Sequence, residues 1–238
     1  MKEQYSAYAN SGAIVLFPCA MDEQEKQDVQ HSVLFAQLAA NKKFPLTADP
    51  DDWYSIWQQV LKGQWLQRRV EWSTVTPGPG IGFKAMDGMI GVLRPALAEA
   101  GDWVPILQAV AALPVTDPAI AFLQERIRQP ASCEGADQIN ANQRHRFLVV
   151  VAQPGPRLSA AYVTLTSAAG AEGNPYARTF SADSLRGPLE QRFFQADLAA
   201  PLFDPVRDTL AKRLEPHVDL IKAIDFSQPD SVRCEPAG

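Results

Sequence analysis

Residues 83–113 read FKAMDGMIGVLRPALAEAGDWVPILQAVAAL and form the most apolar stretch of the chain. Apolar side chains recur in it at helical spacing in two segments, which residues 99–102 would join. The first segment has Phe83, Met86, Met89, Ile90, Leu93 and Leu97, and the second has Trp103, Ile106, Leu107, Val110 and Leu113. Two helices that are apolar on nearly all sides either form the centre of a domain or contact lipid.

We predict that this helix pair is buried against a β-sheet. Burying each large apolar side chain contributes about 1.5–3 kcal/mol, so exposing all of them would cost more than the whole stability of a typical domain. Asp87 and Arg94 would then mark the solvent edge or the mouth of a cavity. Because methionine adapts to irregular spaces, Met86 and Met89, together with Leu93, are the residues expected to line an acyl tunnel.

The tryptophans are a second group of candidate ligand-lining residues, with Trp57 and Trp72 foremost. Most of them sit on the apolar stripe of their element, which favours the alternative that they are core anchors. The five are Trp53, Trp57, Trp65, Trp72 and Trp103.

The composition is that of a soluble globular protein, with 46% hydrophobic and 21% charged residues among 238. This length suffices for one large domain or two small ones. The net charge of −5 argues against binding to the phosphates of a nucleic acid, which requires a basic surface. We therefore expect no nucleic-acid partner.

The sequence shows no secretory signal. Residues 1–10 are polar, and the apolar run at 13–17 is too short for the core of a signal and follows no basic segment. No stretch approaches the roughly 20 apolar residues that cross a bilayer as one helix. We expect synthesis in the cytoplasm without a cleavable signal, and any export by a route that does not read one.

Cysteines and histidines are few and scattered. They are Cys19, Cys133, Cys234, His31, His145 and His217. Without CxxC or HxxxH spacing, neither a disulfide framework nor a metal site is expected. Cys19 is the candidate nucleophile, because it follows an expected strand and precedes a helix N-terminus, a setting that lowers the pKa of a thiol. The alternative, which fits most free cysteines, is a small buried apolar residue.

Three helices have clear start signals. Asp22 caps the first, which ends near residues 41–43, where two lysines suit the helix dipole. Asp49 would cap the second with Pro50 at its first position, and the apolar stripe then runs from Trp53 to Leu61. Asp117 followed by proline starts the third. The acidic pair at 51–52 is explained by its place in a first helical turn.

Strands are expected at 11–17, 66–75, 146–152, 158–166, 176–181 and 189–198, from apolar runs or alternation bounded by turn residues. A Pro-Gly turn at 154–155 makes the third and fourth of these a hairpin. A helix should start at Asp204-Pro205, and residues 218–224 favour one more short helix.

These elements predict a single α+β domain over residues 1–226, with apolar helices packed against one face of a mostly antiparallel sheet. It would comprise a helix-rich part at 12–128, a linker at 129–144, and a β-rich part with C-terminal helices at 145–226. Residues 227–238 are expected to form a polar tail.

One segment resembles a known family. Residues 32–44 read SVLFAQLAANKKF, and Trp53-Tyr54 and Trp65 follow them. Together with the expected strand, apolar helix pair, hairpin and late helix VRDTL at 206–210, this order is similar to the Evf-like bacterial proteins, named for the Erwinia virulence factor. The resemblance spans about residues 32–214, and its specific part is FAQLAANKK with the WY pair.

The resemblance implies an α/β protein with a long apolar cavity, a fatty acyl chain on a cysteine, association with membranes and a role in colonising a host. The chain departs from this pattern in its later half, since residues 145–226 contain no cysteine that matches the acylated one. Cys133 falls in the expected linker and Cys234 in the tail.

Three functions fit these observations. The favoured one is a non-enzymatic, virulence- or toxin-like bacterial protein that binds a fatty acyl chain or lipid and associates with membranes or a host factor. It would need no cofactor other than a bound or covalently attached acyl chain. The second is a cysteine-dependent acyltransferase or hydrolase that uses Cys19. The third is an interaction module whose exposed sheet edge or apolar patch docks a partner.

Overall fold

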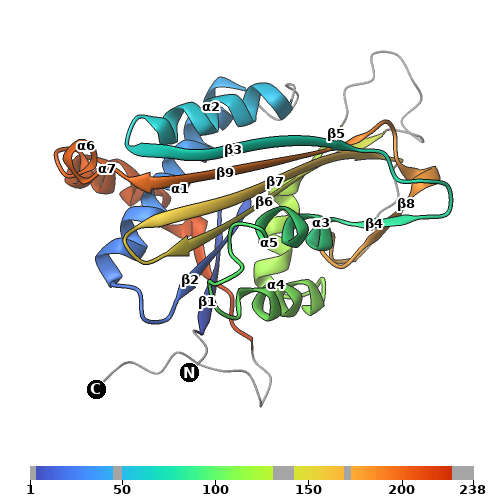
Figure 1. Cartoon of the computed structure of the whole chain (residues 1–238), viewed down its shortest axis with the longest axis horizontal. Coiled ribbons are helices and arrows are strands. Elements are labelled where there is room, and N and C mark those ends of the chain that lie inside the picture. Colours follow the sequence, from blue (N-terminus) through green and yellow to red (C-terminus); the bar gives the residue numbers. More distant parts are fainter. Residues whose placement is uncertain (1–3, 45–49, 131–141, 169–172, 227–238) are drawn as a thin grey trace.

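An eight-stranded sheet runs through the molecule, with helices on both of its faces (Figure 1). The computed structural model describes residues 4–44, 50–130, 142–168 and 173–226. The strand order is β10-β1-β2-β6-β7-β9-β3, and β5 pairs with β6 beside this path. Neighbouring strands are antiparallel except β2 and β6, which run parallel. The predicted α+β class with a mostly antiparallel sheet is confirmed.

The strands of this sheet are β1 (Tyr5–Asn10), β2 (Ala13–Pro18), β3 (Trp65–Val75), β5 (Arg128–Pro130), β6 (Gln143–Gln153), β7 (Arg157–Ser167), β9 (Leu189–Leu198) and β10 (Ile221–Ala223). A separate two-stranded sheet joins β4 (Gly82–Lys84) to β8 (Thr179–Ser181). The α-helices are α1 (Glu23–Lys43), α2 (Pro50–Lys62), α3 (Ala85–Leu93), α4 (Trp103–Ala112), α5 (Pro118–Ile127), α6 (Ala200–Phe203) and α7 (Arg207–Leu214). Two 3-10 helices are η2 (Ala182–Ser184) and η3 (Glu215–Leu220).

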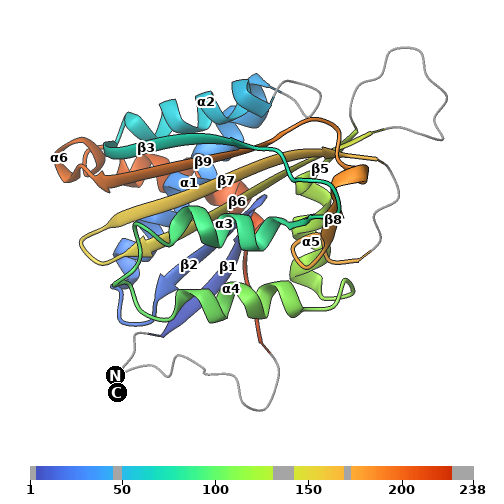
Figure 2. The same cartoon turned by 45° about the vertical axis from the view of Figure 1, so that its right-hand side comes forward.

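Two hydrophobic cores lie on the two faces of the large sheet. Helices α3, α4 and α5 build one core with the strands, and α1 and α2 build the other. Figure 2 shows α3 and α4 on the near side of the sheet and α1 and α2 behind it. The sequence predicted helices on one face of the sheet only. The amphipathic pattern of a helix shows that one of its sides is buried, but it does not show which face of the sheet that side covers.

The apolar helix pair is buried against the sheet, as predicted. Met86, Met89, Leu93, Trp103 and Leu107 are all at most 2% exposed, whereas the Asp87 and Arg94 side chains face solvent. The first helix is shorter than predicted, because Phe83 belongs to β4 and pairs with Phe180 of β8. A Cβ atom on Gly88 would lie 2.5 Å from Cζ of Phe83, so this glycine gives the ring room beneath α3.

The helix caps follow the sequence signals. The Asp22 side chain accepts hydrogen bonds from the backbone N–H groups of Gln24 and Glu25, and the Asp117 side chain accepts from those of Ala119 and Ile120. Both arrangements satisfy N–H groups that a helix start leaves without a partner. The predicted cap Asp49 lies outside the described residues.

The N-terminal strand β1 was not predicted. Its residues Tyr5, Ala7 and Ala9 are buried at alternate positions, but the serine and tyrosine between them and the asparagine that follows made the segment look polar. A tight turn joins β1 to β2, and Ser11 in that turn has a φ of 51°, in the left-handed region that non-glycine residues rarely adopt.

Three predictions near the C-terminus were wrong. Residues 218–224 form the end of η3 and the strand β10, which pairs with the unpredicted β1, instead of a helix. The strand expected at 176–181 is reduced to Thr179–Ser181, because its partner β4 has only three residues. The helix expected from Asp204 begins only at Arg207, as α7, because residues 204–206 form the turns that follow the unpredicted short helix α6.

The proposed halves of the domain share the large sheet, because β2 from the first half pairs with β6 from the second. The predicted linker is shorter at both ends, where Gln129 and Pro130 belong to β5 and Gln143 and Arg144 to β6. Its remaining residues from 131 to 141 lie outside the described residues, as does the predicted tail at 227–238.

Candidate functional site

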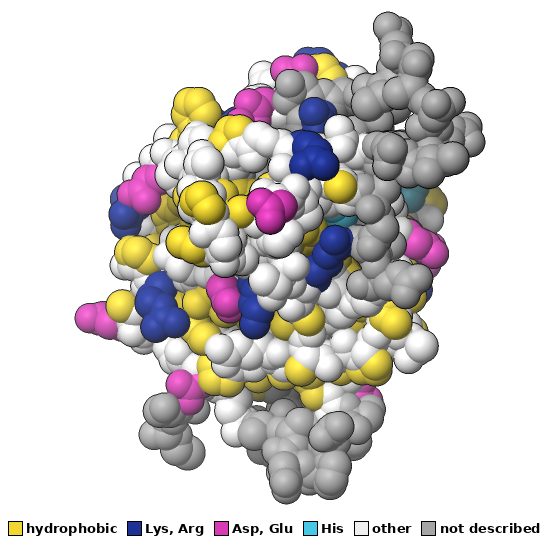
Figure 3. Space-filling view, turned by 90° about the vertical axis from the view of Figure 1, so that its right-hand side faces the viewer, with side chains coloured by type: hydrophobic (Ala, Val, Ile, Leu, Met, Phe, Trp, Pro, Cys, Tyr) yellow, Lys and Arg dark blue, Asp and Glu magenta, His cyan; other side chains and the backbone are white. Residues whose placement is uncertain are grey.

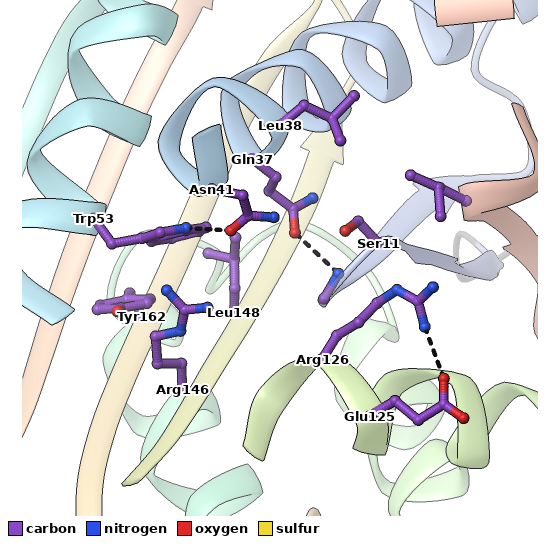
Figure 4. A pocket seen from close by; sticks show the side chains of 12 residues that line it. Ser11, Gln37, Leu38, Asn41, Trp53, Glu125, Arg126, Arg146, Leu148 and Tyr162 are labelled. Atoms are coloured by element: carbon purple, nitrogen blue, oxygen red, sulfur yellow. Dashed lines mark hydrogen bonds and ion pairs between the residues drawn. The ribbon is translucent and has the colours of Figure 1, made fainter. Parts of the chain in front are cut away.

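A pocket of about 560 Å³ lies beside β6, at the point where the strand paired with β6 changes from β5 to β2. Strand β5 pairs with β6 at residues 143–145, and β2 pairs with it at residues 148–151. Arg146 and Phe147 fall between these two stretches, and Arg146 and Leu148 line the pocket. We call it the sheet-break pocket. Its other walls come from α1, α2, β7, the β1–β2 turn and the end of α5 (Figure 4).

The buried side-chain amide of Gln37 holds the β1–β2 turn at one side of the pocket. Oε1 of Gln37 accepts a hydrogen bond from the Gly12 N–H at 3.0 Å, and its Nε2 donates to the Asn10 carbonyl oxygen at 2.8 Å. The Ser11 N–H donates to the Leu220 carbonyl oxygen at 2.7 Å. These bonds explain how Ser11 keeps its left-handed backbone conformation.

Two aromatic side chains and one cationic side chain are stacked at the opposite side of the pocket. The ring of Trp53 lies parallel to the ring of Tyr162, with centroids 5.8 Å apart. The Arg146 guanidinium lies 4.6 Å from the Trp53 ring centroid, and Nε1 of Trp53 donates to Oδ1 of Asn41 at 2.7 Å. This stack fixes a cation against an aromatic face within the pocket.

Arg146 is the most deeply buried cation of the pocket, with 9% of its surface exposed. Burial lowers the pKa of its guanidinium, Tyr162 opposes that shift, and Arg144 adds to it. An arginine keeps its charge under these conditions because its ordinary pKa is very high. The pocket therefore contains a permanent positive charge in a weakly solvated position.

A second cation, Arg126, lies across the pocket. Its guanidinium lies 3.6 Å from the Phe122 ring centroid, donates to the Phe122 carbonyl oxygen at 2.9 Å and pairs with Glu125 at 3.4 Å. Apolar side chains of Leu38, Leu148 and Leu220 also line the pocket. A pocket lined by apolar side chains and by two arginines suits a ligand that has an apolar part and an anionic group.

The five predicted ligand-lining residues lie elsewhere. Met86, Met89 and Leu93 are buried between α3 and the sheet, and Trp57 is buried under α2. Trp72 is 64% exposed on β3, where the Arg192 guanidinium lies 5.4 Å from its ring centroid. None of the five is among the described residues that line the sheet-break pocket, so their role in ligand binding stays a prediction.

Cys19 follows β2 directly and is half-buried. It is disulfide-bonded, and its backbone N–H donates to the Gln4 carbonyl oxygen at 2.7 Å. The two other cysteines, Cys133 and Cys234, lie outside the described residues. A nucleophilic role of Cys19 would require the reduced thiol.

A serine–histidine contact was not predicted. Nε2 of His145 lies 3.0 Å from Oγ of Ser167, and the His145 ring packs against the Phe147 and Phe180 rings. Such a pair resembles a nucleophile with its base, but both residues are fully buried. We interpret the pair as a structural contact that joins β6 to the end of β7.

A smaller hollow of about 180 Å³ lies on the same face of the sheet, lined by Asp51, Arg144 and Glu190 among others. Burial raises the pKa of Glu190, and the neighbouring Asp51 raises it further, while Arg192 opposes the shift. Asp51 and Glu190 both contact the Arg192 guanidinium. We interpret this cluster as an ion-pair network between α2 and β9, in addition to the helix-start role inferred for Asp51.

Within the described residues, no group of three or more His, Cys, Asp or Glu side chains is arranged to hold a metal ion. In the same part of the chain, every helix is too short or too polar to cross a membrane. On the face in Figure 3, acidic and basic side chains lie interspersed among apolar and polar ones.

Comparison with known proteins gives distant structural matches alone. No protein-family model and no curated protein matches the sequence. A delta-endotoxin structure matches with a TM-score of 0.42 and 10% identity, over 79% of this chain and 83% of that chain. The structure of the Evf virulence factor matches with a TM-score of 0.34 and 11% identity, over 88% of this chain and 81% of that chain. Scores this low carry no argument about function, so the family resemblance stays a prediction.

Proposed function

We propose that this protein is a non-enzymatic, virulence- or toxin-like protein that binds a fatty acid or a related acyl lipid in the sheet-break pocket. The observation that carries the proposal is the buried Arg146 guanidinium, held against Trp53 in a pocket that three leucines also line. A carboxylate or phosphate group would bind the guanidinium through charge-assisted hydrogen bonds. The acyl chain would lie along Leu38, Leu148 and Leu220.

The size of the pocket supports this class of ligand. Small-molecule pockets have volumes of about 300–1,000 Å³ and are mostly apolar, with a few polar groups that fix the orientation of the ligand. The volume of about 560 Å³ falls within that range. Arg146 and Arg126 are the polar groups that would fix the head of the ligand, and Tyr162 and Trp53 would give its upper chain a flat wall.

The proposal is tested by titrating the protein with a fatty acid and with the fatty alcohol of the same chain length. Arg146→Gln should weaken binding of the acid at least about tenfold, because a hydrogen bond to a charged group contributes about 1.5–3 kcal/mol. Binding of the alcohol should change by less than about threefold, because it does not use the charge. Arg157→Gln, which changes an arginine at the far end of β7, is the matched control.

Equal weakening of both ligands by Arg146→Gln would point to damage of the pocket instead of a lost head-group contact. A urea unfolding curve of the variant separates that case. If neither ligand binds the wild-type protein, the proposal is wrong. Flotation with liposomes, and the mass of the protein from its native producer, test the membrane association and the attached acyl chain as separate parts of the same proposal.

A further inference from the structure

Strand β3 forms one edge of the large sheet and is unusually exposed. Its 11 residues pair with β9 on one side, and all side chains from residue 66 to 74 are exposed. At the opposite edge, β10 has three residues. Short edge strands limit pairing with other chains, whereas a long open edge offers unpaired N–H and C=O groups.

Exposed apolar side chains gather on this edge. Of the seven large apolar side chains that are exposed in the described residues, Leu66, Val70 and Trp72 lie on β3. The strand also carries opposite charges two residues apart, because Arg69 and Glu71 form an ion pair with half-exposed side chains. Exposed ion pairs of this kind contribute little to the stability of a monomer.

We infer that β3 pairs with β3 of a second copy of this chain, antiparallel and about a twofold axis at Val70, so that the two sheets become continuous. In a symmetric antiparallel pair, residues at equal distances from the axis lie opposite each other. The axis at Val70 places Arg69 opposite Glu71 of the second copy, and Glu71 opposite its Arg69. The two valines meet at the centre.

The side chains lie on the faces that this register requires. Arg69 lies over the Phe193 ring, which belongs to the core under α3, and its contact with Glu71 places both charges on that face. Trp72 stacks with Arg192, which also contacts Tyr54 of α2, so Val70 and Trp72 lie on the other face. The four charges of the two copies would therefore form one alternating group on a single face.

Other symmetric registers of this edge are less favourable. An axis at Glu71 brings two carboxylates together, and an axis at Arg69 brings two guanidinium groups together, which is repulsive in a directly opposed pair. An axis at Trp72 places Glu71 opposite Ser73 and Arg69 opposite Val75, so neither charge lies opposite a charge of the other sign. The bulge between Gln67 and Arg69 lies on one side of the Val70 axis, so the regular pairing about Val70 covers Arg69 to Glu71, and Trp72 to Val75 lie opposite the bulged segment of the second copy.

The test is the mass in solution, measured by sedimentation over a range of protein concentrations. The wild-type chain should approach twice 26.1 kDa at high concentration. Arg69→Glu and Glu71→Arg should each weaken the dimer at least about tenfold, because each makes like charges face each other. The double variant R69E/E71R should restore dimerisation to within about threefold of wild type.

A cysteine at the axis tests the register independently. Opposed Cα atoms in an antiparallel pair are about 4.5–5.5 Å apart, within the range of a disulfide. Val70→Cys should therefore cross-link two chains under mild oxidation, as read from the linked peptides by mass spectrometry. Trp72→Cys is the matched control, since in this register its two Cα atoms lie far beyond disulfide reach.

A wild-type chain that remains a monomer at every concentration would overturn the inference and leave the edge to another partner or to solvent. A dimer that is insensitive to both charge reversals, a double variant that stays monomeric, or cross-linking through Trp72→Cys instead of Val70→Cys would also overturn it. Thermal unfolding of each variant confirms that the exposed substitutions leave the fold intact.

Discussion

Helices α1 and α3 lie on opposite faces of the same sheet and bury different chemistry. The buried side chains of α3 are all apolar, namely Ala85, Met86, Met89, Ile90 and Leu93. Those of α1 include Asp28, Ser32 and Gln37, and each of Asp28 and Gln37 has a hydrogen-bonded partner. The buried side of α3 is an apolar core, whereas the buried side of α1 combines packing with polar contacts and lines the sheet-break pocket through Gln37 and Leu38.

This difference teaches that the most apolar helices of a chain need not line the pocket in which a ligand is proposed to bind. The helix pair fills the space between itself and the sheet, so it stabilises the fold. The pocket forms on the face whose helices carry buried polar groups. Such groups can line the gap that is left where the pairing partner of β6 changes. The predictions below test the two faces in order of expected effect.

The largest effect is expected on the α3 face. Leu93→Ala should lower the free energy of unfolding by about 2–5 kcal/mol, because Leu93 is fully buried between α3 and the sheet. Urea unfolding measures the loss, and Arg94→Ala, an exposed neighbour, should change it by less than about 0.5 kcal/mol. Small destabilisation by Leu93→Ala together with lost lipid binding would show that the helix pair acts at a membrane, contrary to its packing.

On the α1 face, the next effect should come from an ion pair that joins α1 to α7. Nε and Nη2 of Arg207 donate to the two carboxylate oxygens of Asp28 at 3.0 and 2.9 Å. Arg207→Ala should cost about 1.5–3 kcal/mol, because it leaves the buried Asp28 carboxylate without this donor. Arg213→Ala on the exposed side of α7 is the control, and a smaller loss in the double variant D28N/R207A would confirm the origin of the cost.

Two buried tryptophans, one on each face of the sheet, allow a direct comparison of the two cores. Nε1 of Trp103 on α4 donates to the Leu97 carbonyl oxygen at 3.3 Å, whereas Nε1 of Trp57 on α2 has no hydrogen-bond partner among the described residues. Replacing either by phenylalanine removes the same volume, but only Trp103→Phe loses a hydrogen bond. We expect Trp103→Phe to cost about 1 kcal/mol more than Trp57→Phe in urea unfolding. Equal costs would mean that this hydrogen bond contributes nothing net.

The smallest effect is a pH dependence at the exposed end of the sheet. The Arg157 Nε donates to Oδ1 of Asp197 at 2.6 Å and, with Arg68, lowers the pKa of Asp197. A carboxyl group with a lowered pKa in the folded state stabilises the fold above its ordinary pKa, and that stability is lost as the pH falls through the lowered value. Asp197→Asn should reduce the fall in the free energy of unfolding at acid pH. At neutral pH it should lower that free energy by under about 1 kcal/mol. Unfolding curves from neutral to acid pH measure both.

Much of the fold could be predicted because several elements carry their pattern locally. The caps at Asp22 and Asp117 and the burial of Leu93 and Trp103 follow from residues that are close in sequence. Strands β1 and β10 were missed for the opposite reason. Neither carries a strong local signal, and each is a strand because the other, or β2, offers it a partner.

The pocket could not be predicted for a related reason. It depends on β5 and β2 reaching β6 from distant parts of the chain and leaving Arg146 between them. In the sequence, Arg146 is the first residue of the strand expected at 146–152, and nothing near it indicates burial. Its burial against Trp53 of α2 has no local signature, because the stacking partner lies far away in sequence.

The parallel pairing of β2 with β6 also bears on how the chain folds during synthesis. Ile14 and Val149 are neighbours in the sheet, although more than half of the chain separates them. The β1–β2 hairpin leaves the ribosome early, but the strand that covers its inner edge emerges only after α5 has been made. Contacts between distant segments slow folding and leave strand edges open for longer. Until β6 arrives, the Ala13–Pro18 edge is the part of the nascent chain most in need of a chaperone.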